Sequence, residues 1–289
     1  MELANGYTLM HEHMCIDLTP GDPGTRAFTE FCEDLSELKQ RWGVGNVVDL
    51  TNQSMGRDVG YVQRLAEETG LNIVMSTGYY LEQFIADYVE EATGEELTEL
   101  AVRDLTEGID GTGVKAGVIG EIAWSKPEPG PLELKAWDAM CEAALRTGAV
   151  VSTHATRGYQ DLQQAEDLVG RGIDPGKIVI GHCEFCPDDE SLRKLLATGV
   201  CIGIDMIGNA DGKGDEYRAD LVRKVKDMGG LSQVTLSLDL CNREDLRSVG
   251  GYGYAHLFET FLPMLKKRGI TDDDIELMLD ETPRRVFAD

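Results

Sequence analysis

The chain alternates short apolar runs with longer amphipathic segments. The apolar runs are rich in Val, Ile, Leu and Thr and are bounded by Gly and polar residues. They cover residues 6–13, 45–51, 72–78, 116–123, 148–155, 177–184, 199–205 and 233–239. Runs this short and this apolar are typical of strands that are buried in a parallel sheet.

Helical patterns lie between these runs. The segment 131–148 begins with Pro131 and ends at Gly148, which is the usual asymmetry of helix ends. The other expected helices cover residues 28–43, 57–70, 81–110, 159–171, 188–197, 214–229 and 254–269. Eight such β/α units in 289 residues, with no linker between them, predict an α/β fold. We expect a (β/α)8 TIM barrel that forms a single domain over residues 1–289.

Polar residues end several of the expected strands, where a TIM barrel carries its active site. His11 and His13 end the first strand. Because positions i and i+2 share one face of a strand, these two side chains could bind one ion together, with Glu12 on the opposite face. The corresponding residues of the fourth, fifth, sixth and eighth strands are Glu121, His154, His182 and Asp239.

Each of these residues has a plain structural explanation by itself. A lone histidine is often a hydrogen-bonded core residue, and a lone carboxylate can cap a helix. Buried charges are costly unless they are paired or bind metal, so the set as a whole predicts a metal site. Six ligands suit two divalent ions, of which zinc fits imidazole and carboxylate donors well. We assign His11, His13 and Asp239 to one ion, His154 and His182 to the other, and Glu121 as the bridge.

The sequence resembles the phosphotriesterase family of the amidohydrolase superfamily. The resemblance rests on GYTLMHEHMCIDL (6–18), VVDLTNQSMGR (47–57), VSTHA (151–155), VIGHCE (179–184) and LSLD (236–239), and it extends over nearly the whole chain. It implies a barrel with a binuclear metal centre, and it carries the ligand roles over to the histidines named above and to Asp239. Many relatives have a carboxylated lysine as the bridge on strand four. Here that strand reads GVIGEIA, so the bridging role falls to Glu121.

These features predict a hydrolase in which a metal-bridging hydroxide attacks a small ester, lactone or phosphoester, and Asp239 accepts its proton. One alternative is an amidase that acts on N-acyl amines or amino acids with the same centre. Another is a metal-binding barrel without catalytic activity. Tyr80 and Arg243 follow the third and eighth strands and are candidate substrate-binding residues. Packing of Tyr80 against the barrel rim and surface pairing of Arg243 with neighbouring acids are the alternatives.

The composition limits the classes of partner that the chain is expected to bind. The formal net charge is −25, from 52 acidic and 27 basic residues, and such a surface repels phosphate backbones and anionic membranes. We therefore expect a small-molecule substrate and no nucleic-acid or membrane partner. Barrels of this kind occur as monomers and dimers, so we expect a monomer or homodimer. The seven cysteines are odd in number, and no apolar run has the length of a signal peptide or a membrane span. We expect reduced thiols and a cytoplasmic location.

Overall fold

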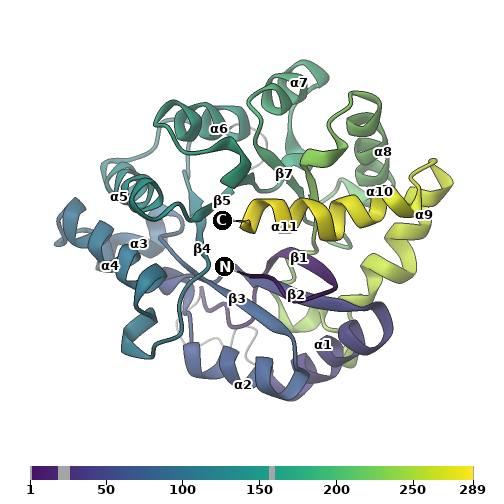
Figure 1. Ribbon diagram of the computed structural model, residues 1–289, viewed down its shortest axis with the longest axis horizontal. Helices are drawn as coiled ribbons and strands as arrows, with labels where there is room; N and C mark the ends of the chain where they lie inside the picture. The colour runs from purple at the N-terminus through teal and green to yellow at the C-terminus, as the bar shows by residue number, and fades with distance from the viewer. Residues whose placement is uncertain (1, 19–26, 156–159, 289) are drawn as a thin grey trace.

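Eight parallel strands form a barrel in the computed structural model, which describes residues 2–18, 27–155 and 160–288 (Figure 1). The strands follow one another around the barrel in chain order, and each of the seven neighbouring pairs from β1 to β8 is parallel. This confirms the predicted α/β barrel. The strands are β1 (Tyr7–Glu12), β2 (Val44–Asp49), β3 (Asn72–Thr77), β4 (Val118–Ala123), β5 (Val150–His154), β6 (Ile178–Ile180), β7 (Cys201–Ile204) and β8 (Val234–Leu236).

Burial explains why most residues of the strands are apolar. Every residue of β2 and of β4 is buried, because one face of each strand fills the barrel interior and the other packs under the helices. The helices surround the strands in Figure 1. None of the helices in the described ranges is long and apolar enough to cross a membrane.

The helices lie close to their expected positions. They are α1 (Phe28–Trp42), α2 (Val59–Thr69), α3 (Glu82–Val89), α4 (Gly94–Thr106), α5 (Pro131–Thr147), α6 (Asp161–Gly170), α7 (Asp189–Ala197), α8 (Gly214–Asp227) and α9 (Leu262–Lys267). Residue 159, the first of the range expected for α6, lies outside the described residues. Helix α5 begins at Pro131 and is followed by Gly148, whose φ of 68° ends the helix as the sequence predicts.

The single helix that we expected over residues 81–110 is two helices. A capping box starts α4: the Thr93 hydroxyl accepts the Glu96 amide proton, and the Glu96 carboxylate accepts the Thr93 amide proton at 2.8 Å. Such a box satisfies backbone donors that would otherwise bond within a longer helix, so it marks a new helix start.

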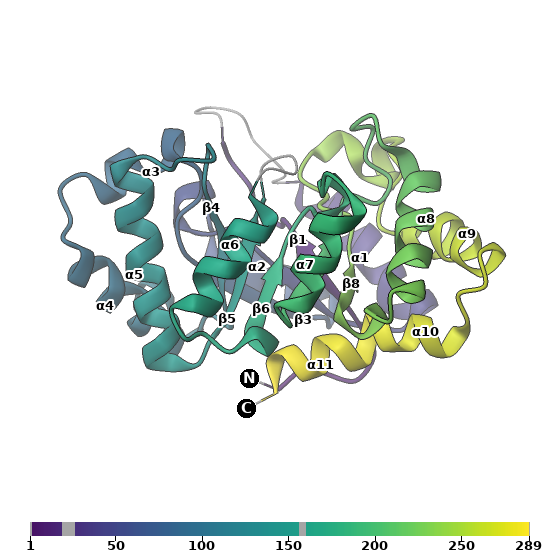
Figure 2. The same cartoon turned by 90° about the horizontal axis from the view of Figure 1, so that it is seen from above.

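The helix expected over residues 254–269 contains a π-helical turn, and the helices that follow it were not expected from the hydrophobic pattern. A π-helical turn over Leu257–Phe261 precedes α9, and the chain continues through α10 (Asp272–Glu276), a second π-helical turn (Leu277–Glu281) and α11 (Thr282–Phe287). Figure 2 shows α11 across one end of the barrel, beside both chain termini.

Helix α11 closes the end of the barrel that is opposite to the carboxyl ends of the strands. Val286 and Phe287 are buried in one apolar cluster with Val118 and Val150, the first residues of β4 and β5. The polar residues of interest therefore lie at the other, carboxyl end of the strands.

Candidate metal centre

Two histidines at the end of the first strand face a buried glutamate of the fourth. His11 and His13 leave β1 on the same side, and their Nε2 atoms lie 3.4 Å and 3.5 Å from the Oε2 and Oε1 atoms of Glu121. Asp239, which follows β8, brings its Oδ1 atom to 3.2 Å from His13 Nε2 and 3.7 Å from His11 Nε2. The structure thus places these four side chains together.

His154 at the end of β5 and His182 shortly after β6 approach the same glutamate. His154 Nδ1 lies 3.1 Å and His182 Nε2 lies 3.8 Å from Glu121 Oε2. The two rings are in contact, because His154 Nδ1 and His182 Nε2 are 2.9 Å apart. Imidazoles of both pairs therefore lie within 3.8 Å of the Glu121 carboxylate, as the contacts of a bridging ligand require.

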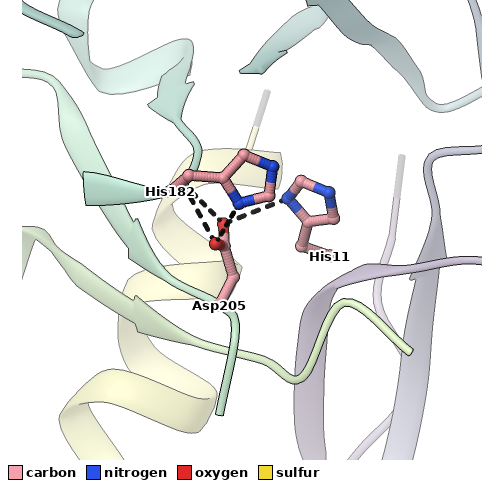
Figure 3. A group of neighbouring side chains, drawn as sticks. All are labelled: His11, His182 and Asp205. Carbon is pink, nitrogen blue, oxygen red and sulfur yellow. Dashed lines mark hydrogen bonds and ion pairs between the residues drawn. The ribbon is translucent and has the colours of Figure 1, made fainter. Parts of the chain in front are cut away.

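Asp205, directly after β7, is a further member of the site. Its Oδ2 atom lies 3.0 Å from His11 Nδ1, and its Oδ1 atom lies 2.8 Å from His182 Nδ1 (Figure 3). The His182 backbone amide also donates to Oδ1 at 3.0 Å. An ionised carboxylate only accepts hydrogen bonds, so both Nδ1 atoms carry a proton, and each of these two histidines would bind a metal through its Nε2 atom.

Asp205 is not among the residues selected from the sequence, although it ends the apolar run at 199–205 just as other site residues end their runs. Space for its carboxylate comes from Gly203, two residues earlier in β7. A Cβ atom at Gly203 would lie 2.3 Å from Asp205 Oδ2. The side chain supports two histidines from the outside of the centre, a role that the position of a residue along the chain does not reveal.

The electrostatics of the site balance buried carboxylates against imidazoles. Burial raises the pKa values of Glu121 and Asp205, but the adjacent histidines lower both pKa values by more, so the two carboxyl groups are ionised. Burial lowers the pKa of His182, but the Asp205 carboxylate raises it by more, so the pKa is about 9. Burial dominates at His154, whose pKa is lowered.

His11 and His13 follow the same balance as His182. Burial lowers the pKa of His11 and the carboxylates of Asp205 and Glu121 raise it by more. Burial also lowers the pKa of His13, and the carboxylate of Asp239 is the main group that raises it. The net effect is a raised pKa for His13. Without cations, protons on these imidazoles compensate the carboxylate charge. Bound cations would replace the protons, which is the usual coupling of metal binding to proton release.

The donor atoms fit a pair of cations. His11 Nε2 is buried and makes no hydrogen bond among the described residues, so it is an available ligand atom. Ligand atoms of His11, His13 and Glu121 lie within 4.8 Å of one another, and so do those of Glu121, His154 and His182. The two groups share Glu121. A third group of this kind contains Asp205, whose oxygens already accept the Nδ1 protons of its two histidines.

The two candidate substrate-binding residues lie in different surroundings. The Tyr80 hydroxyl is 3.4 Å from His154 Nδ1, and the buried ring stacks on Phe84. Arg243 has 47% of its side chain exposed and pairs with Glu30 of α1. None of the interactions found for Arg243 within the described residues reaches the histidine cluster, so its role in substrate binding stays a prediction.

The sequence profile of the Phosphotriesterase family matches residues 2–287. The chain belongs to the phosphotriesterase family. Members of this family are hydrolases with a binuclear metal centre, so the predicted enzyme class is confirmed, and the cluster described above is compatible with such a centre.

Three relatives cover most of the chain. The phosphotriesterase homology protein of Escherichia coli (strain K12) is 36% identical over 286 residues, which are 98% of each protein. A crystal structure of that protein, with phosphate in its active site, has a TM-score of 0.92 at 35% identity and 98% coverage of both chains. N-acetyltaurine hydrolase of Dictyostelium discoideum is 30% identical over 264 residues (87% of this chain, 71% of the relative). Aryldialkylphosphatase of Saccharolobus solfataricus is 28% identical over 300 residues (98% and 95%).

Proposed function

We propose that the chain hydrolyses a small ester, lactone or phosphoester with two divalent metal ions. His11, His13 and Asp239 would hold one ion, and His154 and His182 the other. The single observation that supports this assignment best is the position of Glu121, whose carboxylate faces both pairs of imidazoles. Zinc is the ion that we propose, because imidazole and carboxylate donors suit it.

When bound, two such ions lower the pKa of a water molecule and polarise the acceptor oxygen of the substrate. The residues of the chain supply the proton transfer. The side chain of Asp239 is 13% exposed, against 3% for Glu121 and 2% for Asp205. Asp239 is therefore the carboxylate of these three that a substrate can reach most easily, and we assign to it the transfer of a proton from the nucleophile to the leaving group.

Tyr80 is suited to contact the substrate. Its hydroxyl lies beside His154, and burial raises its pKa well above the ordinary value for tyrosine. The hydroxyl therefore keeps its proton and can donate a hydrogen bond to an oxygen of the substrate. Arg243 could bind an anionic group of the substrate only after it leaves Glu30.

Amide hydrolysis is the second candidate function. It is favoured by the similarity to N-acetyltaurine hydrolase, which covers 87% of this chain. The chemistry requires the same residues, with Asp239 passing its proton to the departing amine. An N-acyl amine or N-acyl amino acid would then be the substrate.

A substrate panel separates these functions. Metal-loaded protein would be assayed with lactones, aryl esters, phosphotriesters and N-acyl amines and amino acids, alongside Asp239→Asn and the control Glu244→Gln, an exposed acid from the same loop. We expect wild type and control to hydrolyse one class, and Asp239→Asn to lose about 10²- to 10⁴-fold in kcat. Unchanged turnover in Asp239→Asn would refute its role in proton transfer. Failure of loaded wild type on every class would favour the non-catalytic barrel.

The cysteines and the net charge bear on the location and the partners of the enzyme. All seven cysteines are free thiols, which fits a reducing cytoplasm. The net charge of −25 disfavours nucleic acids and anionic membranes as partners. We propose a cytoplasmic monomer or homodimer that acts on a small molecule.

A further inference from the structure

The seam of the barrel, where β8 meets β1, is held together differently from the other strand pairs. Seven neighbouring strand pairs are joined by parallel ladders, whereas no such ladder joins β8 to β1 within the described part of the chain. A backbone hydrogen bond from the Asp239 amide to the His11 carbonyl, 3.2 Å long, crosses this seam. Side chains supply further hydrogen bonds there.

Glu12 lies in this seam and is fully buried. Its Oε1 atom accepts hydrogen bonds from the Ser237 hydroxyl at 2.7 Å and from the Leu238 amide at 2.9 Å. Its Oε2 atom accepts the Leu240 amide proton at 3.0 Å. The Ser237 hydroxyl oxygen in turn accepts the His11 amide proton at 2.9 Å, which directs the hydroxyl proton towards Glu12.

The two amides that Glu12 binds flank Asp239. The φ angle of Asp239 is 49°, in the left-handed region that residues other than glycine seldom adopt. Such a conformation persists only where the surrounding structure holds it. Here one buried carboxylate holds the residues on both sides of the turn, and the Asp239 side chain lies 3.2 Å from His13.

We propose that Glu12 is a positioning residue of the metal centre. Its carboxylate fixes the turn at 238–240 in the shape that presents Asp239 to the ion held by His11 and His13. The inference rests on the proposed function in one respect, namely that Asp239 is a metal ligand. It also gives every residue of the His-Glu-His triplet a role, with the histidines facing the centre and the glutamate holding the turn that carries their third ligand.

The variant Glu12→Gln tests this role. Glutamine has nearly the same shape, but its amide nitrogen is a donor and cannot accept a hydrogen bond from a backbone amide. Ser237→Ala is a milder second variant that removes one of the three donors. Asp104→Asn serves as the control, because Asp104 is a buried carboxylate that accepts from Thr77 and Arg57 and makes no contact with the proposed ligands among the interactions described.

Cobalt(II) titration of the metal-free full-length proteins, followed by visible absorption, gives the affinity of each ion. We expect Glu12→Gln to weaken the ion at His11, His13 and Asp239 by about tenfold or more, and Ser237→Ala to weaken it by about three- to tenfold. Asp104→Asn should bind both ions as wild type does. In an Asp239→Asn background, Glu12→Gln should cause little additional loss, because the group that Glu12 positions is already altered.

Two results of the cobalt titration would overturn the proposal: wild-type affinity in Glu12→Gln, or an equal additional loss in the Asp239→Asn background. Amide hydrogen exchange of residues 237–241 in the metal-free proteins gives an independent readout. We expect faster exchange in Glu12→Gln, and unchanged exchange would also overturn the proposal. If wild type binds no cobalt, the metal centre itself is wrong, and the exchange measurement still decides whether Glu12 holds the turn.

Discussion

At the scale of single residues, Asp205 accepts the Nδ1 protons of both His11 and His182, so a change at Asp205 acts on two proposed ligands at once. In Asp205→Asn only one side-chain oxygen remains as an acceptor. We expect metal affinity to fall by about 10- to 100-fold with the fold retained. Competition with a chelator measures the affinity, and Asp104→Asn is again the control. An affinity equal to that of wild type would show that Asp205 does not orient the histidines.

Protonation of His182 predicts how metal uptake depends on pH. In the metal-free protein Asp205 raises the pKa of this histidine to about 9, although burial opposes the rise. The proton stabilises the metal-free fold most fully below the ordinary pKa of about 6.5, and this stability is lost as the pH rises through about 9. A metal ion must displace the same proton, so uptake should release protons and become tighter with increasing pH up to about 9.

Calorimetric titration with cobalt(II) in two buffers of different ionisation enthalpy counts the released protons. We expect the affinity to rise between about pH 6 and about pH 8. Uptake without proton release, or an affinity that does not change over this range, would contradict the charge balance described for the site.

Much of the site was predictable from residue types at strand ends. The alternation of side chains along a strand predicted that His11 and His13 share a face and that Glu12 turns away, and both features are present. The role of Glu12 was not predictable, because its partners lie 225 to 228 residues away at the end of β8. Asp205 was missed for a related reason, since it binds histidines of two other strands.

At the scale of elements, α11 closes the end of the barrel away from the metal site. Phe287 is 3% exposed and lies in the apolar cluster with the first residues of the strands. We expect Phe287→Ala to lower the free energy of unfolding by about 3 kcal/mol, because it leaves a cavity. Urea denaturation measures this loss, and metal content should stay at the wild-type value because the helix is far from the ligands.

Leu134→Ala on α5 is the matched control for this variant. Leu134 is 41% exposed, so its truncation should change the free energy of unfolding by less than about 0.5 kcal/mol. A similar small effect for Phe287→Ala would mean that α11 does not contribute to the stability of the barrel.

The helices that were predicted and those that were missed differ in their sequence signals. Helix α5 carries Pro131 at its start and Gly148 after its end, and its bounds were predicted almost to the residue. The break at Thr93 was missed because the capping box lies within a continuous amphipathic pattern. The segment 272–287 was missed because two short α-helices are separated by a π-helical turn, which shifts the helical periodicity.

At the scale of the whole molecule, one chain of eight β/α units brings residues from six strands to the same point. The proposed ligands lie between residues 11 and 239, and they meet because parallel strands of a barrel all end on one rim. The family assignment agrees with this geometry over residues 2–287. The proposed binuclear centre depends most on Glu121, which we propose bridges the two metal ions.

Metal content per chain, measured on protein purified without chelator, tests that bridging role most directly when wild type is compared with Glu121→Gln. Glutamine keeps the shape but loses the charge that two cations would share. We expect about two ions per chain in wild type and about one in Glu121→Gln. The control Asp104→Asn should retain about two. The same number of ions in wild type and in Glu121→Gln, or no metal in wild type, would contradict the bridging role and the binuclear centre.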